Sequence, residues 1–139
     1  MADKAELPSE ITQGATVRGN EYGWTISSFP EALANAQAQG YACLGGQFQF
    51  RISDGGTCEM YWLSADSKER AEDESWINYS HRSCAEVLDA FRRRVSEADF
   101  AKEAAGWPAP IDPIKHLVFV AYFVTESDLA ELAKKIAAR

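Results

Sequence analysis

The strongest constraint on the fold lies in residues 44–63, where apolar and polar residues alternate on both sides of the turn sequence 53–56. Alternation with a period of two is typical of a half-buried β-strand. Glycines 55 and 56 can supply the positive φ that a tight reversal of the chain needs. The stretch therefore predicts a β-hairpin. Its predicted inward face consists of Phe48, Phe50, Ile52, Met60 and Trp62.

The register of this hairpin follows if the two apolar faces are to match. A slip of one residue would turn every side chain to the other face of the sheet. The matching register also brings Arg51 opposite Glu59, a pair of opposite charges worth roughly 0.2–1 kcal/mol. The expected pairs are Ile52–Cys58, Phe50–Met60, Phe48–Trp62, Arg51–Glu59, Gln49–Tyr61 and Gln47–Leu63.

Local signals predict the remaining elements. Ser28 and Glu31 have the spacing of a capping box, Ser75 is a helix cap beside acidic residues, and Thr125 with Asp128 starts a last helix. The run Leu117–Val124 is apolar on both parities, so it needs cover on both faces. We expect a weak strand over 16–26, a helix over 28–40, the hairpin, a long helix from 75, a short helix over 97–105, a strand over 117–124 and a final helix.

This order predicts an α+β fold: an antiparallel sheet with helices mainly on one face, in the ferredoxin-like βαββαβ order plus a C-terminal helix. The second face of the strand 117–124 would be covered by the last helix or by a second subunit. We expect residues 1–15 to be a flexible tail and residues 16–139 to be a single domain.

Length and charge limit the class of protein. A chain of 139 residues has the size of one domain, and its net charge of −7 disfavours DNA or RNA as a partner. The N-terminus lacks the apolar segment of a signal peptide, and the longest apolar run is eight residues, far short of a membrane span. The three cysteines match no zinc or redox motif, so we expect reduced thiols and a cytoplasmic protein.

Catalytic and metal-binding patterns are weak. His81 and Cys84 are three residues apart on a predicted helix, but two ligands do not make a metal site. Cys58 and Cys84 fall on apolar faces, where cysteine behaves as a small hydrophobe. We therefore expect no metal, no cofactor and no catalytic residue, and we favour a binding protein over an enzyme.

Two surfaces are candidates for binding a partner. One is the outward face of the hairpin, where arginine, tyrosine and glutamine resemble the composition of interfaces. The other is an acidic stretch after the hairpin. The alternative for both is an ordinary solvated surface. The sheet-face candidates are Gln47, Gln49, Arg51, Glu59 and Tyr61, and the acidic candidates are Asp66, Glu69, Glu72, Asp73 and Glu74.

In size, acidity and lack of catalytic motifs the chain resembles bacterial immunity or inhibitor proteins as a class, a likeness of profile that rests on no motif. This likeness implies a small acidic cytoplasmic module that binds a protein and neutralises a basic toxin or enzyme. One alternative is a small-molecule binder or enzyme of the dimeric α+β-barrel type, with a cavity lined by Phe119, Phe123 and Trp62. Another is an accessory subunit of a larger assembly, and a homodimer is also open.

Overall fold

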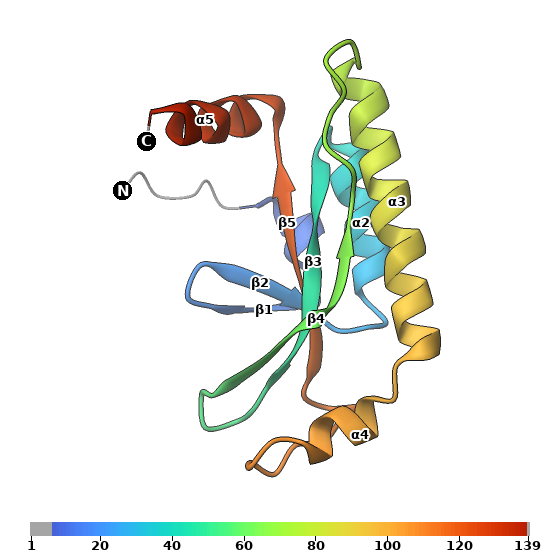
Figure 1. Ribbon diagram of the computed structural model, residues 1–139, viewed down its shortest axis with the longest axis vertical. Coiled ribbons are helices and arrows are strands. Elements are labelled where there is room, and N and C mark those ends of the chain that lie inside the picture. The colour runs from blue at the N-terminus through green and yellow to red at the C-terminus, as the bar shows by residue number, and fades with distance from the viewer. Residues whose placement is uncertain (1–6, 139) are drawn as a thin grey trace.

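Residues 7–138 are described by the computed structural model, and they form a five-stranded antiparallel sheet with two long helices on one face (Figure 1). The elements are α1 (Ser9–Thr12), β1 (Ala15–Arg18), β2 (Glu21–Trp24), α2 (Phe29–Ala38), β3 (Ala42–Arg51), β4 (Thr57–Asp66), α3 (Trp76–Glu97), α4 (Phe100–Ala105), β5 (Leu117–Val124) and α5 (Glu126–Ala137).

The strand order is β1-β2-β5-β3-β4, and every neighbouring pair is antiparallel. The predicted α+β class with an antiparallel sheet is confirmed. The ferredoxin-like arrangement is not established by this order. The single weak strand expected over 16–26 is instead a hairpin, β1–β2, which turns at Gly19 with a φ of 62°. β5, near the end of the chain, lies between β2 and β3 at the centre of the sheet.

Local capping explains where most helices begin. Ser75 accepts a hydrogen bond from the Asn78 backbone, and Thr125 with Asp128 forms a complete capping box. The capping box predicted at Ser28 is absent, because the Ser28 hydroxyl bonds to Thr25 in the preceding turn. The short helix α4 begins at Phe100 with Asp99 as its cap, three residues later than predicted.

The main core lies between the sheet and helices α2 and α3. Phe29 of α2 is fully buried there, and its ring centroid is 4.8 Å from that of Phe91 and 4.7 Å from that of Phe119. Phe48 adds a ring 4.9 Å from Phe119. Such tilted and edge-on contacts are favoured between aromatic rings, and they stabilise the packing of the helices on the sheet.

The other face of the sheet is covered in part by the β1–β2 hairpin, which projects on the side away from α2 and α3 (Figure 1). Arg51 donates to the backbone oxygens of Thr16 and Glu21, and Arg18 donates to that of Ile52. This cover explains why the side chains on both faces of β5 are apolar. The last helix does not provide it, because α5 has no buried residue among those described.

The hairpin β3–β4 is present, but its predicted register is wrong by two residues. Phe50 lies opposite Cys58 and Phe48 opposite Met60, because Ile52 belongs to the connecting loop, where its N–H bonds to the Gly56 oxygen at 3.0 Å. A shift of two preserves which side chains face inward. The predicted Arg51–Glu59 pair does not form, since Thr57 lies opposite Arg51.

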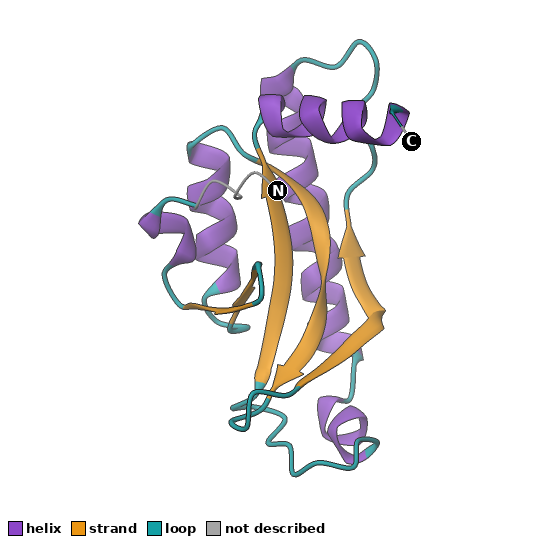
Figure 2. Cartoon of the chain, turned by 90° about the vertical axis from the view of Figure 1, so that its left-hand side faces the viewer, coloured by secondary structure: helices purple, strands orange, loops and turns teal. Residues whose placement is uncertain are grey.

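A bulge in β4 follows directly after this region. Gln47 pairs with Ser64 while its neighbour Phe48 pairs with Met60, so residues 61–63 have no partner on β3. Figure 2 shows the resulting kink in this edge strand. The extra residues turn Trp62 away from the core, and its side chain is 47% exposed. The prediction that Trp62 faces inward is therefore wrong.

The N-terminal segment also differs from the expected flexible tail over 1–15. Ser9–Thr12 form helix α1, and Ile11 is fully buried. The Ile11 oxygen accepts a hydrogen bond of 2.8 Å from the Trp24 indole nitrogen. The part of the expected tail over 1–6 lies outside the described residues. No helix in the described range has the length and apolar character needed to cross a membrane.

Candidate binding surface

The five sheet-face candidates do not form one exposed surface. Gln49 is 1% exposed and Arg51 is 6% exposed, because the β1–β2 hairpin lies over them. The Arg51 guanidinium donates to the Gln49 side-chain oxygen at 2.7 Å and to both oxygens of Thr16. Burial, and then the nearby charge of Arg18, lower the pKa of Arg51. These two side chains hold the hairpin in place and cannot reach a partner.

Gln47, Glu59 and Tyr61 remain accessible on the outward side of β3 and β4. The Gln47 amide donates to the Glu59 carboxylate at 3.5 Å, a long contact between two surface groups. Tyr61 is 72% exposed, the largest value for any aromatic side chain among the described residues. The accessible part of the predicted sheet face is therefore centred on the edge strand β4.

The acidic candidates divide in a similar way. Glu74 accepts hydrogen bonds of 2.7 and 2.8 Å from Arg82, and this contact is the main reason why the pKa of Glu74 falls to about 2. Glu74 thus organises the loop between β4 and α3. The exposed acidic side chains are Asp66, Glu69, Glu72 and Asp73.

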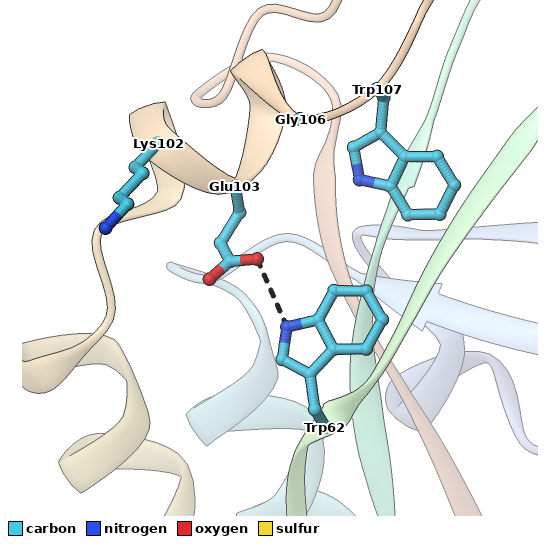
Figure 3. Close-up of a pocket in the computed structure, with 5 residues that line it drawn as sticks. All are labelled: Trp62, Lys102, Glu103, Gly106 and Trp107. Atoms are coloured by element: carbon cyan, nitrogen blue, oxygen red, sulfur yellow. Dashed lines mark hydrogen bonds between the residues drawn. The ribbon is translucent and has the colours of Figure 1, made fainter.

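A shallow hollow of about 340 Å³ lies between β4 and the segment around α4. We call it the indole hollow; its lining residues are Trp62, Lys102, Glu103, Gly106 and Trp107 (Figure 3). The Trp62 indole donates to the Glu103 carboxylate at 3.1 Å. The two indole rings lie 15° from parallel, with centroids 6.5 Å apart.

Tyr61 extends the aromatic surface of this hollow. Its ring meets that of Trp62 edge-on, at 5.1 Å and 78°. We call Tyr61, Trp62 and Trp107 the aromatic cluster. Alternation does not predict this cluster, because it places Trp62 in the core. No local signal marks the bulge, because Tyr61, Trp62 and Leu63 are also compatible with a regular strand in which successive side chains face opposite sides.

Among the described residues, no hydrogen bond joins a cysteine to a histidine. Burial raises the pKa of Cys84 to about 11 and raises that of Cys43 still further, so both thiols stay protonated at neutral pH. His81 is exposed on α3, and His116 accepts a hydrogen bond from the Asp112 backbone. Within residues 7–138, no three His, Cys, Asp or Glu side chains are grouped so that they could hold a metal ion.

The three residues expected to line the cavity of a dimeric α+β-barrel protein are not brought together within the described chain. Phe119 and Phe123 are buried in the core, while Trp62 lies in the indole hollow. No protein-family model, curated protein or solved structure matches the sequence. The function therefore has to be inferred from the surface residues and their charges.

Proposed function

We propose that this chain is a protein-binding module of the inhibitor or immunity type, which acts in the cytoplasm on a basic partner protein. The observation that carries the proposal is the aromatic cluster on an acidic chain: Tyr61 and Trp62 are exposed, and Trp107 is half-buried beside them. Tyrosine and tryptophan are enriched at the centres of protein interfaces, where they supply much of the binding energy. A module of this kind blocks its partner by occupying it and needs no catalytic group.

The rigidity of the cluster supports binding. Trp62 is held by the β4 bulge and by its hydrogen bond to Glu103, and Tyr61 packs edge-on against it. A side chain that is already ordered loses little conformational entropy when a partner arrives. The cluster can therefore contribute most of its buried area to affinity.

The charge of the chain supports a basic partner. The net charge is −7, and the exposed carboxylates of Glu69, Glu72 and Asp73 lie on one loop. Such a surface attracts a positively charged protein over a distance and raises the association rate, most strongly at low salt. A nucleic acid carries the wrong sign of charge for this surface.

The proposal is tested by capture of partners on the immobilised chain, at salt concentrations of about 50 and 500 mM. We expect one basic protein to be retained at low salt and released at high salt. Tyr61→Ala should abolish its retention. Ile77→Ser is the matched control, because Ile77 is an exposed apolar residue at the start of α3, at the opposite end of the molecule from α4 (Figure 1).

Three results would contradict the proposal. One is the absence of any partner that distinguishes the native chain from Tyr61→Ala. Another is a retained partner that is acidic or whose binding is unaffected by salt. The third is self-association of the chain through Tyr61, measured by sedimentation, which would show that Tyr61 binds a second copy of the chain and not a basic protein.

A further inference from the structure

We propose that the indole hollow is the receptor for a guanidinium group, namely an arginine side chain of the basic partner. This inference rests on the proposed function and names the group that the partner presents. Arginine is itself enriched at interface centres and pairs there with aromatic residues. The chemistry of the hollow favours this group for three separate reasons.

The first reason is an uncompensated carboxylate. One carboxylate oxygen of Glu103 accepts a hydrogen bond from the Trp62 indole N–H. Within residues 7–138, no cationic side chain lies close enough to form an ion pair with this carboxylate. Lys102 is the adjacent residue, but its side chain turns away from both indoles (Figure 3). A cation that enters the hollow would therefore find the unpaired carboxylate of Glu103 beside the indoles.

The second reason is the flat aromatic wall. The two indoles are 15° from parallel with centroids 6.5 Å apart, and Trp62 is bonded to the Glu103 carboxylate, so two similarly oriented ring faces lie next to this charge. A planar guanidinium can stack on tryptophan and still donate hydrogen bonds in its own plane to a carboxylate. A lysine ammonium is more strongly hydrated and cannot stack, so it gains less from the same site.

The third reason is open space at Gly106. Its φ of −75° suits any residue, so the backbone does not require glycine there. A Cβ at this position would meet only the Glu103 backbone oxygen, at 3.4 Å. The absence of a side chain leaves this side of the hollow open, which gives the aliphatic stem of an arginine a path to the indoles.

The experiment follows the indole N–H signals of the full chain by NMR while a blocked Gly-Arg-Gly tripeptide is added. We expect saturable shifts at Trp62 and Trp107 only. Trp24 and Trp76 are internal controls, because their indole N–H groups are bonded to the backbone oxygens of Ile11 and Gly40. The Gly-Lys-Gly peptide should bind at least about threefold more weakly, and a citrulline peptide, which has the shape without the charge, should not saturate.

Two variants test the roles of charge and stacking. Glu103→Gln keeps an acceptor for the Trp62 N–H and removes the charge, so we expect at least about a tenfold loss of affinity for the arginine peptide. Trp107→Ala removes half of the π-surface and should cost roughly threefold or more. Unchanged Trp24 and Trp76 signals verify that each variant is folded.

Equal binding of the arginine and lysine peptides, or no effect of Glu103→Gln, would overturn the guanidinium site. So would the absence of shifts at Trp62 and Trp107. If the immobilised chain still retains a basic partner in a Tyr61-dependent way, the proposed function survives this failure. If no such partner exists either, both proposals fail.

Discussion

Glu74 shows how one carboxylate orders the loop that follows β4. It accepts hydrogen bonds from Arg82 and also from the Ala71 backbone at 3.1 Å. Arg82 in turn donates to Glu86 at 2.7 Å. Like charges in this loop repel one another, and the contacts of Glu74 with Arg82 offset part of that repulsion. The ion pair therefore determines which acidic side chains point to solvent and which are held.

This pair predicts a pH dependence of stability. The pKa of Glu74 lies at about 2 in the folded chain, below its ordinary value of 4.5. The stabilisation is therefore present above about pH 4.5 and is lost as the pH falls toward 2. We expect the melting temperature of Glu74→Gln to be below that of the native chain at pH 7, and the two to converge near pH 2.

The control for this experiment is Glu72→Gln, which removes an exposed acidic residue of the same loop that forms no ion pair in the described structure. Its melting temperature should follow that of the native chain at every pH. A Glu74→Gln difference that is constant with pH would show that the shape of the side chain, and not its charge, stabilises the loop.

At the scale of elements, the β1–β2 hairpin depends on Arg51 for its position across the sheet. Gly23 of β2 lies so close that a Cβ there would be 2.9 Å from the Arg51 guanidinium carbon and 2.9 Å from Val118. Glycine at this position allows the two layers to approach each other. Arginine then satisfies the backbone oxygens on the underside of the hairpin.

Arg51→Met should therefore destabilise the chain. It leaves the Gln49 oxygen and the backbone oxygens of Thr16 and Glu21 without their donor, at a cost of about 3 kcal/mol. The measurement is urea unfolding. Arg93→Met is the control, because Arg93 is exposed and forms only a 3.4 Å pair with Asp89; we expect a change within about 0.5 kcal/mol. Equal effects of the two substitutions would contradict this role.

At the scale of the whole molecule, the stable core is formed by the sheet with α2 and α3, and α5 stands apart from it (Figure 1). α5 has no buried residue among those described, and Leu132 and Ile136 are exposed. Among the described residues, the helix is attached through the Thr125 capping box, a 2.9 Å pair between Arg70 and Glu126, and the half-buried Leu129. Such a helix has little tertiary support.

We therefore expect the backbone amides of α5 to exchange with solvent through local opening, orders of magnitude faster than those of β3 and β5. Hydrogen exchange followed by NMR measures this difference directly. The amides of α3 are the control, because a helix of 22 residues packed on the sheet should exchange only with global unfolding. Equal protection of α5 and β5 would show that α5 is covered by something else, such as a second copy of the chain.

Features that depend on near neighbours can be predicted from the sequence. The inward parity of Phe48, Phe50 and Met60 follows from alternation, and the starts of α3 and α5 follow from Ser75 and Thr125. Each of these depends on residues only a few positions apart, so periodicity and capping chemistry are enough to predict them.

Features that join distant parts of the chain depend on how the elements pack together. The hairpin register differs from the predicted register because Ile52 lies in the turn. Arg51 is not on the predicted surface because a hairpin more than 25 residues earlier in the chain covers it. The indole hollow joins Trp62 to Trp107 across a bulge that alternation cannot reveal. Contacts of this kind depend on which segments pack together, and that is set by the whole core.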